Sequence, residues 1–369
     1  MKEQRTRIRT SGNTIVFGTF KAMGDLLCAC PVIKAELDAG CNIHLLLFHN
    51  QALIEFVHLI NFGINRDLLK IHTIPVKIDV KGFRDFLREM VNLDPGLVWI
   101  SPHAPAPASS WKIPISLWLF RKTCWRGARL AGAVSERMSF LFDDRVPVDR
   151  DLPFIEREWR AFYEREGNVG RQSPNISFTE RVSRFRDLPP VYDLLIHPGA
   201  NAKNRSWPAR NYSDVVRNLP PEFRIAVVGL PSDIEMMKAS LPSDRDIEFL
   251  TGSLMDCLIS IARSKVLLTM DSGNVHFARV LQVPAVALFG KSDPANVIPL
   301  DDCVAAIYEK RFPCQPCGKT YCTQPEVYCM NALSPDLVAE AVMRLWHRTS
   351  QAAVDKGLRV ANSPYRILV

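Results

Sequence analysis

Two stretches of this 369-residue chain decide its fold: residues 14–25, TIVFGTFKAMGD, and residues 265–276, KVLLTMDSGNVH. Each begins with an apolar run of strand length and ends in small polar residues that precede a helical pattern. Open α/β sheets bind ligands outside the carboxyl ends of their strands, at positions of this kind. The two stretches therefore predict two sheets, each with a site where a strand is followed by a helix.

Alternating strands and helices continue on both sides of these stretches. The first half reads as a strand at 13–18, a loop at 19–25, a helix at 26–39 and a strand at 42–48. The second half repeats the alternation from residue 192. The pattern predicts a first α/β domain at 1–170, a linker at 171–190, a second α/β domain at 191–333, a helix at 334–348 and a tail at 349–369.

Composition agrees with two soluble α/β domains. The hydrophobic fraction is 47%, and the length exceeds what one core usually accommodates. Neither a signal peptide nor a membrane span is readable, so the ten cysteines are expected to be reduced thiols in a cytoplasm. The net charge of +7 is modest, and no recognition motif accompanies it, which argues against nucleic acid as a partner.

The positive charge gathers in one segment. Residues 96–134 contain no Asp or Glu but hold four of the seven tryptophans. If Pro114 opens a helix, one face of it carries Trp118, Lys122, Trp125 and Arg129 at helical spacing. That face suits anionic lipid headgroups or a phosphorylated acceptor. The alternative is a packed helix with solvated cations.

An ordered set of motifs then supports a resemblance. It comprises Met23-Gly24-Asp25, His197 to Ala200 leading to Arg205-Ser206-Trp207-Pro208, Val228-Gly229, Thr251-Gly252-Ser253, Asp271 to His276, and Leu288-Phe289-Gly290 through Asp293-Pro294. Over about residues 14–345 this set resembles glycosyltransferase family 9, the bacterial ADP-heptose:lipopolysaccharide heptosyltransferases. The resemblance implies a GT-B architecture of two Rossmann-like domains facing a central cleft. It further implies nucleotide sugar on the C-terminal domain, acceptor on the N-terminal one, and a closing helix that crosses back.

Asp25 is the expected catalytic base. Inverting transfer needs a group that takes the proton of the acceptor hydroxyl, and Asp25 is the acid of the N-terminal motif. The family's catalytic Asp falls on this residue. The alternative is a helix N-cap, since Asp25 precedes Leu26. Lys21, shortly before it, is a candidate contact for the donor phosphate or the acceptor.

The donor site is expected in the second domain. Backbone amides of Ser272, Gly273 and Asn274 can face a phosphate at a helix N-terminus. Arg205 stands where the family usually has a lysine, and Lys203 could share its task. The other candidates, with the alternatives of capping or packing, are Asp271 for the donor sugar, His276 for phosphate, Asp233 for the ribose hydroxyls, and Ser292 and Asp293 at the border of the donor.

Four cysteines form a further cluster, Cys314, Cys317, Cys322 and Cys329, within sixteen residues. Four thiolates in a short segment can close a tetrahedral site, so a structural zinc or iron is one interpretation. The alternatives are reduced buried thiols and a loop that is oxidised after purification. The resemblance implies that catalysis itself requires no metal or other cofactor.

The sequence therefore predicts a cytoplasmic, inverting glycosyltransferase, peripheral at the inner membrane, that moves a heptose from an ADP donor to a lipid-linked saccharide. Another nucleotide sugar, a protein acceptor or a capsular acceptor is an alternative within the family. Outside this class, a non-catalytic nucleotide-sugar-binding subunit and a sugar-nucleotide epimerase are the other interpretations.

Overall fold

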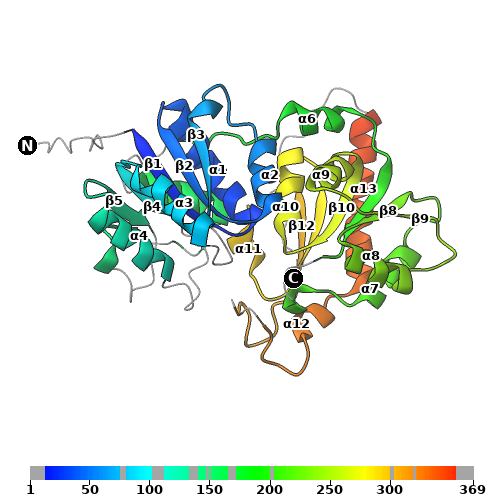
Figure 1. Cartoon of the computed structure of the whole chain (residues 1–369). Helices are drawn as coiled ribbons and strands as arrows, with labels where there is room; N and C mark the ends of the chain where they lie inside the picture. Colours follow the sequence, from blue (N-terminus) through cyan, green and yellow to red (C-terminus); the bar gives the residue numbers. More distant parts are fainter. Residues whose placement is uncertain are drawn as a thin grey trace, which may run out of the picture. The chain divides into compact units, whose positions relative to one another are not determined.

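The computed structural model describes residues 13–74, 80–101, 112–132, 140–146, 149, 151–164, 172–199, 203–299, 303–317, 319 and 321–354 (Figure 1). The chain divides into two compact units, Met1–Ile176 and Ser177–Val369. Each unit is described by itself.

The N-terminal unit is built on a six-stranded parallel sheet in the order β3-β2-β1-β4-β5-β6. Its elements are β1 (Thr14–Phe20), α1 (Met23–Asp38), β2 (Asn42–Phe48), α2 (Gln51–Leu59), η1 (Arg66–Leu68), β3 (Leu69–Ile74), α3 (Val80–Val91), β4 (Leu97–Ile100), α4 (Lys112–Thr123), β5 (Arg129–Gly132), β6 (Asp144–Arg145) and α5 (Phe154–Glu164).

The C-terminal unit holds a second six-stranded parallel sheet, in the order β12-β11-β10-β7-β8-β9. Its elements are α6 (Glu180–Ser183), η3 (Arg184–Asp187), β7 (Tyr192–His197), η4 (Lys203–Arg205), α7 (Ala209–Asn218), β8 (Ile225–Val228), α8 (Pro231–Ser240), β9 (Ile247–Leu250), α9 (Leu254–Ala262), β10 (Ser264–Met270), α10 (Gly273–Leu281), β11 (Ala285–Phe289), α11 (Pro294–Val297), β12 (Val304–Tyr308), α12 (Tyr328–Asn331) and α13 (Pro335–Val354).

Both sheets have the same topology. Counted within its own unit, each follows the order 3-2-1-4-5-6, which is the classic order of the Rossmann fold. In such sheets the strand order reverses between the first and fourth strands, and ligands bind beside the carboxyl ends there. That point lies between β1 and β4 in one unit and between β7 and β10 in the other. The prediction of an α/β fold with two Rossmann-like units is confirmed.

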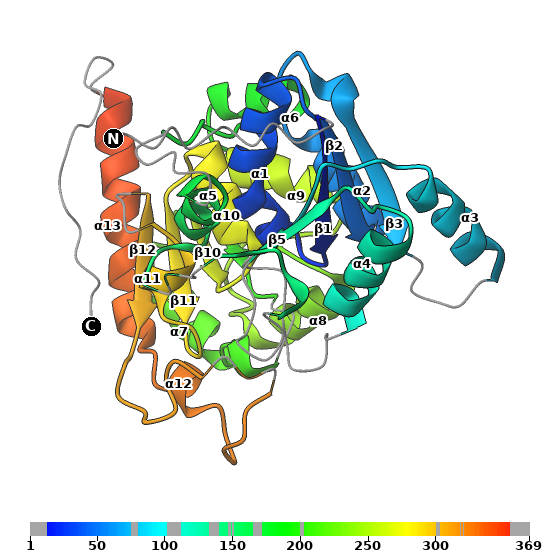
Figure 2. The ribbon, with the colours of Figure 1, turned by 90° about the vertical axis from the view of Figure 1, so that its left-hand side faces the viewer.

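Apolar strands explain the burial of both sheets. The strand β10 is buried at every residue except Lys265, as expected for a parallel strand covered on both faces. The long helix α13 packs against α7 and against β10, β11 and β12 of its own unit (Figure 2). Near its end Trp346 donates to Asp193 of β7, with 3.0 Å between Nε1 and Oδ1. This contact fixes the helix to the start of the central strand.

Several expected boundaries were wrong. The predicted loop at 19–25 is shorter than expected, because β1 continues to Phe20 and α1 already begins at Met23. The expected linker at 171–190 contains the division between the two units, after Ile176, together with the short helices α6 and η3. The last helix continues to Val354 instead of ending at 348. The remainder of the predicted tail lies outside the described residues.

The prediction that the last helix crosses back to the first unit stays a prediction.

Among the described residues, no helix is long and apolar enough to span a bilayer.

Candidate functional site

The point where the strand order of the C-terminal sheet reverses, between β7 and β10, is its switch point. Arg205 and Asp271 meet there. Asp271 follows β10 directly and is buried, while Arg205 ends η4, which follows β7. The Nε atom of Arg205 lies 3.5 Å from Oδ2 of Asp271, and Nη1 donates to the Asp271 carbonyl oxygen at 3.2 Å. Within the described part of the chain, Nε and Oδ2 are buried and have no hydrogen-bond partner. The two atoms form an ion pair with each other but keep hydrogen-bonding capacity that a ligand at this site would use.

The helix α10 begins beside this pair. Ser272 is its N-cap, and the Ser272 side chain accepts from the Asn274 backbone N–H. The alternative that Asp271 caps this helix is therefore wrong. The first turn, Gly273 and Asn274, exposes the positive end of the helix dipole beside a guanidinium, which is an arrangement that favours a phosphate.

His276 lies one turn further and is buried. Burial lowers its pKa to about 4, so this imidazole is neutral at physiological pH. A neutral, buried ring fits the packing interpretation, and the expected phosphate contact stays a prediction.

Lys291, which the sequence reasoning missed, is a second cation at this site. It follows β11 and Gly290, and only 8% of its surface is exposed. Burial and the neighbouring Arg205 charge lower the pKa of Lys291, while Asp271 and Cys317 raise it. Its ammonium group donates to the Lys319 carbonyl oxygen at 2.8 Å. A lysine next to a glycine at a strand end was the available signal in the sequence.

Asp233 lies at the strand end on the other side of the switch point. It is in the first turn of α8, and its Oδ2 accepts from the Leu230 backbone N–H at 3.2 Å. A Cβ atom on Gly199 would lie 2.8 Å from the same oxygen, so the glycine permits this close approach. Leu230 is the N-cap of α8, so the alternative that Asp233 is the N-cap is wrong. Asp233 binds the N-cap N–H from the third helical position, close to the loop that follows β7, which is compatible with the expected ribose contact.

The remaining donor candidates lie at the end of β11. Asp293 caps the short helix α11 through the Ala295 backbone N–H at 3.1 Å, and Lys310 lies 3.9 Å from its other oxygen. Ser292 is partly buried between β11 and α11. Lys203 belongs to η4, but its side chain is outside the described part of the structure.

In the N-terminal unit, Asp25 occupies the first turn of α1, after β1. The N-cap position is Ala22, so the alternative that Asp25 is the N-cap is wrong. The Asp25 side chain is half-buried, at the switch point between β1 and β4. Lys21 is exposed, and its ammonium group lies 4.5 Å from the centroid of the Phe48 ring at the end of β2.

The expected basic and aromatic stripe does not form. The helix α4 ends at Thr123, so Trp125 and Arg129 do not continue its face. Trp125 is a core residue whose Nε1 donates to the Met90 carbonyl oxygen at 2.8 Å. Trp118 is partly buried against the same core, and the exposed Lys122 lies 5.9 Å from its ring centroid.

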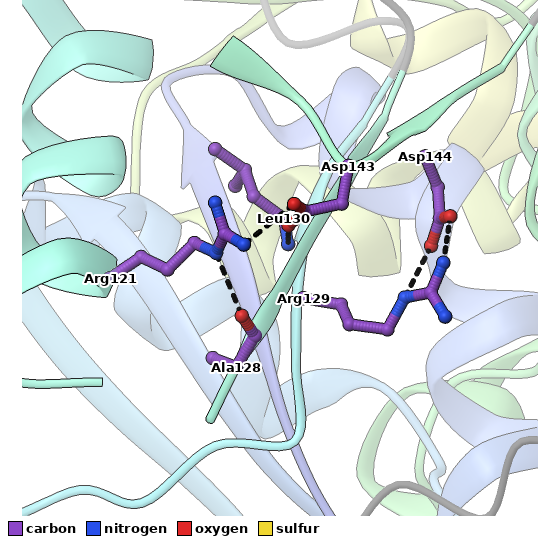
Figure 3. A network of polar contacts seen from close by, with 6 residues as sticks. All are labelled: Arg121, Ala128, Arg129, Leu130, Asp143 and Asp144. Atoms are coloured by element: carbon purple, nitrogen blue, oxygen red, sulfur yellow. Dashed lines mark hydrogen bonds and ion pairs between the residues drawn. The ribbon is translucent and has the colours of Figure 1, made fainter. Parts of the chain in front are cut away.

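Acidic partners also reduce the positive charge of this segment (Figure 3). Arg129 of β5 forms an ion pair with Asp144 of β6. Arg121 of α4 binds Asp143 at 2.6 Å, and the other oxygen of Asp143 accepts from the Leu130 backbone N–H. These arginines hold α4, β5 and β6 together. Trp118 and Lys122 are the two members of the predicted stripe that remain on α4.

The four-cysteine segment lies against the donor site. The backbone carbonyl oxygen of Lys319, within this segment, accepts from Lys291 Nζ at 2.8 Å and from Asn204 Nδ2 at 3.0 Å. The thiol of Cys329 has a raised pKa, first through burial and then through the charges of Cys317, Cys314 and Cys322. The thiols therefore gather in one region. Among the described residues, no three His, Cys, Asp or Glu side chains are placed to hold a metal ion.

A doubly wound fold with two cations and a helix N-terminus at its switch point is typical of proteins that bind phosphorylated nucleotides. Residues 116–328, more than half of the chain, match Glycosyltransferase family 9 (heptosyltransferase). The chain belongs to this family, as the sequence motifs had indicated.

Curated relatives are similar over part of their length. The chain is 25% identical over 161 residues to lipooligosaccharide heptosyltransferase 2 of Campylobacter jejuni, which is 41% of this chain and 51% of the relative. It is 33% identical over 112 residues to lipopolysaccharide heptosyltransferase 2 of Salmonella typhimurium, covering 28% of this chain and 32% of the relative. The match thus spans about half or less of these relatives.

Solved structures are similar over nearly the whole chain. The structure of E. coli ADP-heptose LPS heptosyltransferase II superimposes with a TM-score of 0.64 at 18% identity, over 91% of this chain and 99% of that one. The iron-containing dodecameric glycosyltransferase TibC of enterotoxigenic E. coli gives a TM-score of 0.55 at 14% identity, over 91% and 76% of the two chains. At these identities the likeness shows a shared fold.

Proposed function

We propose that this chain is an inverting glycosyltransferase that moves a heptose from an ADP-linked donor to a saccharide acceptor of the lipopolysaccharide type. The observation that carries the proposal is the cluster of Arg205, Lys291 and the α10 N-terminus around the buried Asp271. Two cations and a set of backbone amides complement a diphosphate without a metal. The heptosyltransferase relatives support heptose and ADP.

In the proposed reaction, the acceptor hydroxyl oxygen bonds to the anomeric carbon while its proton passes to Asp25. The bond from that carbon to the diphosphate oxygen breaks, and the leaving diphosphate gains negative charge. Arg205, Lys291 and the amides of Gly273 and Asn274 stabilise this charge, because fixed donors cost no reorganisation during the reaction.

The other donor contacts are assigned by chemistry. Asp233 accepts the ribose hydroxyls, and Asp271 both orients the sugar and holds Arg205 in place. Ser292 and Asp293 border the donor, and Lys203 adds a cation beside Arg205. A different nucleotide sugar would keep these contacts, since none of them reads the base.

The acceptor side is proposed to involve Lys21, Trp118 and Lys122, which combine exposed cations with an aromatic ring. This chemistry suits a phosphorylated, lipid-linked saccharide at the cytoplasmic face of the inner membrane. Sedimentation of the full chain with vesicles of anionic and of neutral lipid tests the membrane contact. Binding to both or to neither would argue against an electrostatic contact.

Transfer itself is tested with the Asp25→Asn variant. We expect it to bind ADP-heptose as the wild type does and to lose transfer, because Asn cannot take the proton. The anomeric coupling constant in the product, measured by NMR, tests inversion. Full transfer by Asp25→Asn would reject the assigned base, and wild-type protein that binds donor but transfers to no saccharide, protein or capsular acceptor would favour a non-catalytic binding subunit.

A structural zinc or iron in the four-cysteine segment stays a prediction, since these thiols would have to approach one another to hold it. The iron in TibC makes iron the metal to test first. Elemental analysis of protein purified without chelator should find about one metal ion per chain if the prediction is right, and its absence would reject it.

A further inference from the structure

The four-cysteine segment is bonded to Lys291 and to the residue before it. The Gln315 Nε2 atom donates to the Gly290 carbonyl oxygen at 2.6 Å, and the Cys317 backbone N–H donates to the Lys291 carbonyl oxygen at 2.9 Å. The Lys319 carbonyl oxygen accepts from Lys291 Nζ at 2.8 Å. Both the backbone and the ammonium group of Lys291 are therefore held by this segment.

The end of the same segment packs against Gly290. A Cβ atom on this glycine would clash with Met330 Sδ and would lie 3.0 Å from Cys329 Sγ. Met330 is fully buried, so it has no free space to retreat into. A side chain in place of Gly290 would therefore push the segment away from β11, and the glycine permits the close approach.

Asn204 connects the segment to the other cation of the site. It lies in η4 directly before Arg205, and 3% of its surface is exposed. Its Nδ2 atom donates to the Lys319 carbonyl oxygen at 3.0 Å. Its Oδ1 atom is buried and has no hydrogen-bond partner within the part of the chain that the structure describes, so packing alone does not account for an amide here.

The Lys319 carbonyl thereby joins two loops on opposite sides of β10. In the sheet β10 lies between β7, which η4 follows, and β11, which Lys291 follows. A carbonyl oxygen has two lone pairs and can accept from Asn204 and Lys291 together. An ammonium group has three N–H donors, so after the bond to Lys319 it can still donate to phosphate oxygens. A lysine that is fixed before the ligand binds loses less conformational entropy on binding.

We propose that Asn204 and Gln315 are positioning residues that tie the four-cysteine segment to the donor site, so that its Lys319 carbonyl oxygen holds the Lys291 ammonium group towards the donor diphosphate. The inference rests on the proposed function, in which Lys291 binds the diphosphate. Without either tie, the Lys319 carbonyl moves away and Lys291 must be ordered by the ligand itself.

The test is a double-mutant cycle on the full chain, measured by calorimetric titration of ADP. Asn204→Ala should weaken ADP binding about 3- to 10-fold, which corresponds to the loss of about one hydrogen bond. In the Lys291→Met background the same change should weaken binding less than about twofold, because the lysine that Asn204 positions is absent. A residue with only a structural role would lower the affinity by the same factor in both backgrounds.

Gln315→Leu tests the second tie. It removes the hydrogen bond to the Gly290 carbonyl oxygen and keeps a side chain of similar size. It should also weaken ADP binding about 3- to 10-fold in the wild type and less than about twofold in Lys291→Met.

Asn218→Ala is the matched control. Asn218 of α7 donates through Nδ2 to Asp336 of α13 at 2.8 Å, and both side chains are exposed. The variant removes an amide hydrogen bond of the same type from the same unit. It should leave ADP binding unchanged in both backgrounds.

The outcomes distinguish this inference from the proposed function. Wild-type protein that does not bind ADP would reject the assigned donor. Wild-type affinity in Lys291→Met would reject the assignment of Lys291 and this inference with it. If Lys291→Met weakens ADP binding, while Asn204→Ala and Gln315→Leu have no effect or the same effect in both backgrounds, the positioning role alone is rejected. If urea unfolding shows that one variant does not fold, the other decides the question.

Discussion

Replacing Lys291 by methionine separates folding from donor binding. The ammonium group is buried beside the guanidinium of Arg205, and both burial and this charge lower its pKa. Asp271 compensates for one of the two cations. Methionine keeps the length of the side chain and removes the charge, so the repulsion between Lys291 and Arg205 disappears.

The structure gives the size of both effects. The lost hydrogen bond to the Lys319 carbonyl costs about 1 kcal/mol, and relief of the repulsion offsets part of it, so the free energy of unfolding should change by less than about 1 kcal/mol. A charge-assisted bond to phosphate contributes about 1.5–3 kcal/mol. Its loss should weaken ADP binding about 10- to 150-fold.

Calorimetric titration with ADP and urea unfolding without ligand measure the two quantities. The control is Lys238→Met, which removes an exposed cation from α8 in the same unit. It should leave ADP binding unchanged. Wild-type affinity in Lys291→Met, or a loss of stability above about 3 kcal/mol, would show that Lys291 is an anchor of the fold and refute its assignment to phosphate.

Two further variants test the fold and its pH dependence. Asp193→Asn should lower the free energy of unfolding by about 2–3 kcal/mol, because the buried carboxylate binds Lys265 at 2.8 Å and Trp346 at 3.0 Å. This range is already reduced for the access of water to the lysine. A loss below about 1 kcal/mol in urea unfolding would contradict the prediction. Burial lowers the pKa of His276 to about 4. Between pH 6.5 and 4 the unfolded chain therefore binds a proton at this residue, while the folded chain keeps the ring neutral. The pKa values of His44 and His197 are also lowered to about 4 by burial, so His276 contributes one share, about 3 kcal/mol, of the stability lost between pH 6.5 and 4. His276→Gln should remove this share, and parallel losses in both proteins would exclude it.

The sequence motifs predicted the residues at the strand ends more reliably than their partners. Asp271 to Asn274 follow an apolar run, and the reversal of strand order in a doubly wound sheet then brings Arg205 to Asp271. Lys291 joins them only because β11 lies beside β10, and a lysine read from sequence is expected in solvent.

The predicted stripe shows the same limit. Helical spacing continues in the sequence through Trp125 and Arg129, although α4 ends at Thr123. Helical spacing predicts which residues share a face within a helix, but it does not predict where the helix ends.

Titration of this chain with ADP-heptose and with UDP-, GDP- and dTDP-linked sugars tests the central claim most directly. The account predicts the tightest binding for ADP-heptose and a loss of that binding in Arg205→Ala. Tighter binding of another nucleotide sugar would contradict the assigned donor, and ADP-heptose binding unaffected by Arg205→Ala would contradict the assigned site.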